Sequence, residues 1–141
     1  MRFRFLERLQ PLGLLILRLA VGAIMVAHGY KKLFGGGVHS IAASIMSWGW
    51  PWWLAYTVTY LEFIGGALFI AGLITRLLAL GYTIEMALAI WKVHLHNGLT
   101  GPGGFEFPLT VAAITFALIW FGPGPVSIDH LIWGGGHRAN K

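Results

Sequence analysis

Four long apolar stretches dominate the chain, and the polar residues gather mainly between them. The stretches cover residues 11–30, 52–74, 77–96 and 106–121. They are long and lack the alternation typical of strands, so they favour helices. At 1.5 Å of rise per residue the first is about 30 Å long, enough to cross the hydrocarbon core of a bilayer. The pattern predicts an all-α membrane protein: a four-transmembrane-helix bundle with short loops, forming one domain over residues 1–141.

The segments between the stretches indicate how the helices begin and end. Thr75-Arg76 leaves room only for a tight hairpin, and the Gly-Pro-Gly-Pro run at 122–125 ends the fourth span. Residues 38–46, VHSIAASIM, predict a short amphipathic helix at the interface, in the first outer loop. The second span opens with an aromatic cluster of the kind that anchors helices at headgroup level. Its members are Trp48, Trp50, Trp52 and Trp53.

Composition strengthens the membrane interpretation. Apolar residues make up 57% of the chain and charged residues only 11%, which is outside the range of ordinary soluble domains. The net charge of +5 is spread along the chain beside apolar segments, so it argues for topology signals and against nucleic-acid binding. Cysteine is absent, which excludes disulfide exchange, thiolate catalysis, cysteine-held iron–sulfur clusters and cysteine-bound zinc. Arg18 within the first span argues against a cleaved signal peptide.

The basic residues that flank the spans predict an orientation. One side of the membrane would carry six of them, and the other side only Lys31 and Lys32. The positive-inside rule then predicts a multi-pass protein of the cytoplasmic (inner) membrane with both termini in the cytoplasm. The six are Arg2, Arg4, Arg8, Arg76, Arg138 and Lys141.

Several ionisable residues fall inside the spans, where charge is costly and marks candidate functional sites. By helical rise, Glu62 and Glu85 lie about 15 Å deep, and His28 and Lys92 about 6–9 Å from the outer surface. His28 shares a face of the first span with Lys31 and Lys32. The same spacing places Glu85, Lys92 and His96 on one stripe of the third span, with His94 on another.

Glu62 is the strongest of these candidates, because a carboxylate near the midplane cannot reach water. We expect at least one of His28, Lys92, His96 or Glu106 within hydrogen-bonding reach of it. Gly65 and Gly66 follow Glu62 and should allow close approach of another helix.

A structural reading of the same residues stays open. Lys92 and Arg18 can extend to the two interfaces, and His28 can cap the first helix. A buried network around Glu62 can specify packing without catalysis. No metal site is expected, and haem has little support, because the sequence offers nothing beyond the histidines themselves.

The chain contains a set of motifs in a fixed order. Residues 17–35 read LRLAVGAIMVAHGYKKLFG, residues 61–66 read LEFIGG, and residues 72–76 read GLITR. HLHNG at 94–98, GGFEFP at 103–108 and GPG at 122–124, then Ser127-Ile128-Asp129, continue the pattern. In this order and spacing the motifs resemble the DoxX family of four-helix membrane proteins, and the resemblance covers about residues 14–131. Its matching positions are His28, Gly29, Lys32, Glu62, Gly65, Gly66, Arg76, His94, Asn97, Gly98, Glu106 and Pro108.

The resemblance implies a bacterial or archaeal membrane protein from a family named after a subunit associated with quinol oxidation and thiosulfate:quinone oxidoreduction. We therefore expect a small membrane subunit linked to quinone chemistry, with a polar cluster in the outer half of the bundle and electrons supplied by a partner protein. The catalytic candidates are Glu62 and His28. The ligand-binding candidates are Lys32, Lys92, His94, His96, Asn97, Glu106, Trp52 and Trp53.

Other functions compete with this one. A non-catalytic scaffold or assembly protein explains the small size equally well, and transport is less favoured because four short spans leave little room for a cavity. In either of the first two cases the expected partners are membrane lipid and a protein partner or further copies of the chain. The sequence does not decide between a catalytic and a structural role for the buried charges.

Overall fold

The computed structural model describes residues 4–134, which form helices and connecting segments without strands. Residues 4–134 contain six α-helices, one π-helical segment and one 3-10 turn. The α-helices are α1 (Arg4–Phe34), α2 (Gly37–Ser47), α3 (Trp53–Ala71), α4 (Thr75–Ala89), α5 (Glu106–Phe121) and α6 (Ile128–Trp133). The π-helical segment η1 (Ile90–His94) and the 3-10 turn η2 (Leu95–Asn97) continue directly from α4.

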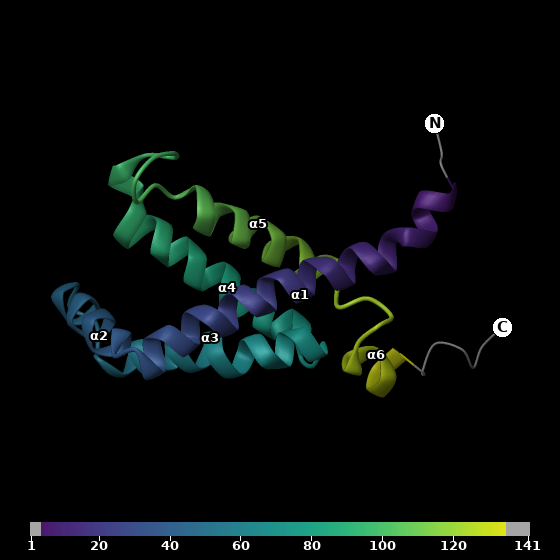
Figure 1. Ribbon diagram of the computed structural model, residues 1–141, viewed down its shortest axis with the longest axis horizontal. Coiled ribbons are helices and arrows are strands. Elements are labelled where there is room, and N and C mark those ends of the chain that lie inside the picture. The colour runs from purple at the N-terminus through teal and green to yellow at the C-terminus, as the bar shows by residue number, and fades with distance from the viewer. Residues whose placement is uncertain (1–3, 135–141) are drawn as a thin grey trace.

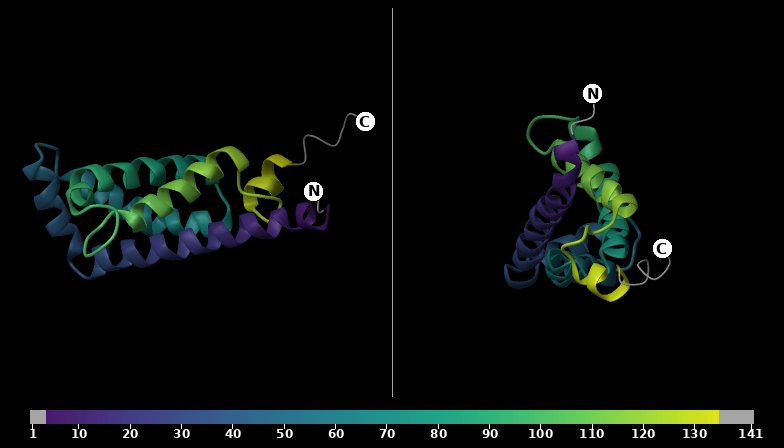
Figure 2. Two further views of the ribbon diagram at one scale, coloured as in Figure 1. Left: turned by 90° about the horizontal axis from the view of Figure 1, so that it is seen from above. Right: turned by 90° about the vertical axis from the view of Figure 1, so that its right-hand side faces the viewer.

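The long helices form two packed pairs. α1 lies along α3, and α4 lies along α5, with α3 joined to α4 by a short turn (Figure 1). α2 lies at the end of the bundle away from the start of α1, and α6 lies near that start (Figure 2). We call the α2 end the outer end and the α6 end the inner end.

The helices suit a membrane as predicted. Residues 6–34, Trp53–Ala71 and 75–97 are each long and apolar enough to cross one, and α5 is a shorter apolar helix of 16 residues. Large apolar side chains point outward from these helices, for example Ile64, Ile84 and Phe116, each more than half exposed. Such a surface is stable only against lipid. The fold is the expected all-α membrane bundle.

Several helix boundaries differ from those expected. α1 begins at Arg4 and includes Pro11, and Thr75-Arg76, expected as the hairpin turn, form the start of α4. α1 continues to Phe34, so Lys31 and Lys32 lie in its last turns and not in a loop. The third span leaves α-helical geometry at Ile90, because η1 is π-helical and widens the turn. The expected stripe of Glu85, Lys92 and His96 is therefore broken between its first and second members. The short helix expected at residues 38–46 is present as α2.

Glycines bring α1 and α3 into backbone contact. A Cβ added at Gly29 would lie 2.4 Å from the backbone N of Phe63, and one at Gly66 would lie 2.8 Å from that of Val26. Gly65 faces α4 instead, with the Tyr82 hydroxyl 3.0 Å from the position of its missing Cβ. The expectation that Gly65 and Gly66 pack against neighbouring helices is confirmed. Small residues permit this approach where lipid gives helices no hydrophobic drive to associate.

Arg18 holds the inner end together and does not extend to the interface. It is 2% exposed. Its Nη1 and Nη2 donate to the carbonyls of Pro123 and Val126, both at 2.6 Å, and its Nε donates to Ile70 at 3.3 Å. Arg18 therefore ties the segment after α5 to α1 and α3. This side chain is a structural tether, and the expectation that Arg18 extends to the inner interface was wrong.

The segment held by Arg18 leads into α6, a helix that the sequence pattern does not predict. Ser127 caps it by accepting a hydrogen bond from the His130 N–H at 3.1 Å. Asp129 then accepts from the N–H groups of Ile74 and Thr75, at 2.7 and 2.8 Å. The first N–H groups of a helix have no acceptor within the helix, so a carboxylate is favoured at the start of α4.

Candidate functional site

A buried ion pair joins α1 to α3 in the outer half of the bundle. Lys32 Nζ lies 2.6 Å from Glu62 Oε1, and the two side chains are 21% and 2% exposed. The Cα–Cβ bonds of a helix tilt toward its N-terminus. Lys32 near the end of α1 therefore leans toward the bundle centre, and Glu62 in the oppositely directed α3 leans toward the outer end. The close contact of Gly29 with Phe63 brings the two helices near enough for the side chains to meet.

A second carboxyl group joins this pair from α4. Glu85 lies near enough to both residues for its charge to interact with theirs. Oε2 of Glu62 and Oε2 of Glu85 are both buried and find no donor among the described residues. Buried polar oxygens are usually hydrogen-bonded, so these two oxygens mark a candidate site for a proton or a ligand. We call Lys32, Glu62 and Glu85 the Lys–Glu–Glu site.

Tyr82 fixes the position of α4 against α3 beside this site. Its ring is fully buried, and its hydroxyl donates to the Leu61 carbonyl at 3.0 Å. The missing side chain of Gly65 leaves room for that hydroxyl. Tyr82 thus sets the height at which Glu85, about one turn further along α4, meets Glu62.

His28 lies one turn from Lys32 on the same face of α1. Its ring is stacked on that of Phe107 in α5, with centroids 5.6 Å apart and planes at 10°. His28 is exposed. It lies at about the depth of the Lys–Glu–Glu site, because the neighbouring Gly29 contacts Phe63 next to Glu62, and it bridges α1 and α5.

Lys92 lies apart from the site, among tryptophans. Its Nζ is 4.0 Å from the ring centroid of Trp91 and 5.1 Å from that of Trp50. Cation–π contacts of this kind hold an ammonium group at a ring face. The π-helical turn that begins at Ile90 carries Lys92 away from the direction of Glu85.

The remaining predicted residues lie around the outer loops. His94 Nδ1 and Asn97 Nδ2 both bond to the Gly103 carbonyl, at 2.7 and 2.9 Å, which fixes the loop before α5. The others are exposed at the ends of helices: His96, Glu106, Trp52 and Trp53. The structure thus brings together Lys32, Glu62 and Glu85, and it leaves the other ligand-binding candidates at separate positions.

Glu62 bonds directly to a residue that was not among its expected partners. We expected His28, Lys92, His96 or Glu106, directly or through one water, and the described hydrogen bond joins it to Lys32 instead. Counting residues along each span gives the depth of the Cα atom only. The signal that could have found Lys32 is the tilt of side chains toward the helix N-terminus, which takes its ammonium group deeper than its backbone.

Sequence comparisons identify the family of the chain. The family profile that matches the chain is described as DoxX, and it covers residues 13–95. This chain belongs to the DoxX family. The matched part runs from within α1 to the first residue of η2 and contains all three residues of the Lys–Glu–Glu site, whereas α5 and α6 lie outside it.

A curated relative extends the similarity over nearly the whole chain. It is 31% identical over 130 residues, which is 92% of this chain and 93% of the relative. That protein, from Bacillus subtilis (strain 168), is named "Putative oxidoreductase CatD". No solved structure matches the chain. The DoxX chain described here is therefore related to a protein named as an oxidoreductase.

Proposed function

We propose that this DoxX protein is a small integral membrane subunit of a quinone-linked oxidoreductase, and that the Lys–Glu–Glu site exchanges its protons. The observation that carries the proposal is the buried Lys32–Glu62 ion pair, with a second carboxyl group, Glu85, near it on α4 and a buried, unpaired Oε2 on each glutamate. Two carboxyl groups share one lysine, so the site can bind or release a proton without leaving an isolated buried charge. The name of the relative supports redox chemistry.

Quinone chemistry needs a proton source at this depth. Reduction of a quinone to a quinol takes two electrons and two protons, and each carbonyl oxygen gains one proton. A partner oxidoreductase supplies the electrons. The carboxyl pair gives one proton to a quinone oxygen and is then reloaded to give the second. Lys32 stabilises the carboxylate left behind after each transfer.

His28 provides a route for the reloading step. Its ring is exposed on the surface of the bundle and lies one turn from Lys32 on the same face of α1. Imidazole is the side chain best suited to carry protons near neutral pH. Access for the apolar tail of a quinone is open from the lipid, because the outward faces of the bundle are apolar.

One observation favours the alternative, a non-catalytic scaffold. The Lys32–Glu62 pair directly joins α1 and α3, and fixing the packing of these two helices is a sufficient role for such a pair. The two functions make different predictions for a pair of neutralising substitutions, because packing and proton exchange respond differently to the loss of both charges.

Glu62→Gln is expected to leave a folded protein and to lower quinone-linked activity by about 100-fold, the usual scale for loss of a proton-transfer group.

Lys32→Met leaves a buried carboxylate unpaired and should cost about 2 kcal/mol of stability, moderated by the 21% exposure of the lysine side chain. The double variant should recover that stability and stay inactive. Unfolding in detergent gives stability, and quinone reduction by membranes of a complemented deletion strain gives activity.

Lys31→Met is the matched control, since Lys31 is exposed and next to Lys32 in the chain. It should match the wild type in both measurements. If the folded double variant retains full activity, the site is structural and the scaffold function is the better account. Loss of activity in the double variant with restored stability supports proton exchange.

We further propose that the protein is a multi-pass protein of a bacterial or archaeal cytoplasmic membrane with its inner end in the cytoplasm. The flanking basic residues support this orientation. Alkaline phosphatase fused after Lys141 should be inactive, and the same enzyme inserted between α2 and α3 should be active. The reverse pattern of activity would contradict the orientation and leave the helical bundle unchanged.

A further inference from the structure

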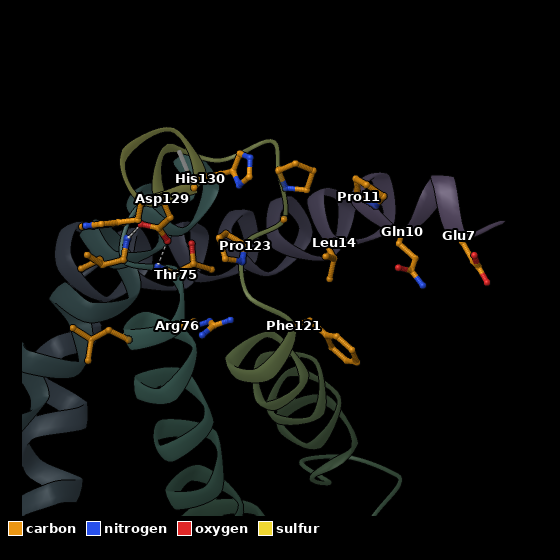
Figure 3. A pocket seen from close by; sticks show the side chains of 16 residues that line it. Glu7, Gln10, Pro11, Leu14, Thr75, Arg76, Phe121, Pro123, Asp129 and His130 are labelled. Carbon is orange, nitrogen blue, oxygen red and sulfur yellow. Dashed lines mark hydrogen bonds between the residues drawn. The ribbon is translucent and has the colours of Figure 1, made fainter. Parts of the chain in front are cut away.

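A large cavity lies at the inner end, far along the bundle from the Lys–Glu–Glu site. Its volume is about 1060 Å³, and it is bounded by the start of α1, the start of α4, the end of α5 and α6 (Figure 3). Its walls are apolar along the helices, with Leu14, Leu77, Phe121 and Trp133 among the lining residues. The proposed function makes no use of it.

The cavity lies where the apolar surface of the bundle ends. α4 begins at Thr75 and α5 ends at Phe121, and both helices present apolar side chains to the outside from there on. In a membrane this level corresponds to the lipid headgroups, with acyl chains beside Leu77 and Phe121, which are 65% and 72% exposed.

Arg76 is the cationic group of this cavity with donors to spare. Its single described hydrogen bond, to the Trp120 carbonyl, is long at 3.4 Å. Its guanidinium lies against Gly122, where a Cβ would come within 3.2 Å of Nε. Asp129 lines the same cavity but already accepts from Ile74 and Thr75, and Glu7 lies on the α1 wall (Figure 3).

A second polar group at this cavity is unpaired. Thr75 also lines it, is fully buried, and its Oγ1 has no hydrogen-bond partner among the described residues. A buried hydroxyl without a partner is costly, and such groups usually indicate a missing ligand or water. Thr75 and Arg76 both line the cavity, so a ligand bound there lies beside both residues.

We propose that the inner cavity binds a membrane phospholipid, with its phosphodiester held by Arg76 and Thr75 and its acyl chains against Leu77 and Phe121. A guanidinium pairs with two phosphate oxygens at once, and a hydroxyl can donate to a third acceptor. The apolar walls contact the first methylene groups of the acyl chains, and a soluble phosphate has no apolar group to make these contacts. The spare donors of Arg76 and the depth of the cavity together fit a lipid headgroup.

The test uses the full chain in detergent, stripped of lipid, with dihexanoylphosphatidylglycerol as the probe. Binding is followed by native mass spectrometry and by the shift in thermal unfolding. Arg76→Gln should bind the lipid about tenfold more weakly, the change expected for one lost charge-assisted hydrogen bond. Arg8→Gln is the control, since Arg8 is exposed on α1 and does not line the cavity. It should bind as the wild type does.

Other outcomes overturn the proposal. Equal lipid binding by Arg76→Gln and the wild type would exclude Arg76 as the phosphodiester ligand. Equal stabilisation by inorganic phosphate and by the lipid would assign the cavity to a soluble anion. If Arg76→Gln does not fold, Leu77→Trp replaces it, because a larger ring at the mouth should lower lipid binding while keeping the charge. Unchanged lipid binding by a folded Leu77→Trp variant would also overturn the assignment.

Discussion

Gly66→Leu is expected to lower the free energy of unfolding by about 3 kcal/mol, the upper end of the range for overpacking a tight interface. A Cβ at Gly66 would lie 2.8 Å from the backbone N of Val26 and 3.0 Å from the carbonyl O of Gly22. Backbone atoms cannot rotate away as a side chain can, so α1 and α3 must separate. Unfolding of the purified protein in detergent by denaturant or heat measures the loss.

Gly13→Leu is the matched control for this prediction. Gly13 is in the same helix as Val26, and a Cβ there meets nothing within 4 Å. The added side chain should therefore change stability little, apart from a small gain in helix propensity. Equal stability of Gly66→Leu and Gly13→Leu would contradict the close packing of α1 on α3.

The same substitution should also disturb the candidate site. Lys32 reaches Glu62 because Gly29 allows α1 to lie against the backbone of Phe63. Separation of the helices at Gly66, further along the same interface, lengthens that ion pair. Gly66→Leu should therefore lose quinone-linked activity together with stability, whereas Glu62→Gln should lose activity alone.

The helical architecture could be predicted from the sequence because lipid imposes a simple requirement. Every apolar segment must satisfy its backbone hydrogen bonds internally, so length and hydropathy are enough to place α1, α3, α4 and α5. The glycines next to Glu62 also carried a readable signal, because a small residue inside a span has few uses other than close packing. These features depend on local composition.

The partners of the polar groups could not be read in the same way. Lys32 is far from Glu62 in the chain, and its ammonium group reaches the site only through the tilt of its side chain. The π-helical turn at Ile90 changes the direction of Lys92 without any proline or glycine inside that turn to indicate it. Distant pairing and local helix irregularity both arise from packing, which a single sequence does not encode in any short pattern.

The inner end shows the same limit. Arg18 has the sequence signature of an intramembrane charge, and its actual partners are the backbone carbonyls of Ile70, Pro123 and Val126. Any residue can offer a carbonyl, so no side-chain pattern identifies such partners in advance. The Gly-Pro-rich segment after α5 marks only the end of that helix, and its return toward α1 depends on this arginine.

Arg18→Met is expected to destabilise the protein by about 4 kcal/mol, the scale for removing one side of a buried charged network. Methionine fills much of the space of the arginine stem but donates no hydrogen bond. The carbonyls of Pro123 and Val126, each bound at 2.6 Å in the wild type, would lose their donor. Arg8→Met, at an exposed position of the same helix, should be nearly neutral.

The loss should be confined at first to the segment that Arg18 holds. Hydrogen exchange or limited proteolysis of residues 122–134 should increase in Arg18→Met before the four long helices unfold. Asp129→Asn weakens the second attachment of this segment, at the N–H groups of Ile74 and Thr75. Because both attachments hold the same segment, Asp129→Asn should cost clearly less in the Arg18→Met background than alone. Fully additive losses would contradict a shared tether and would make Arg18 and Asp129 independent contributors to stability.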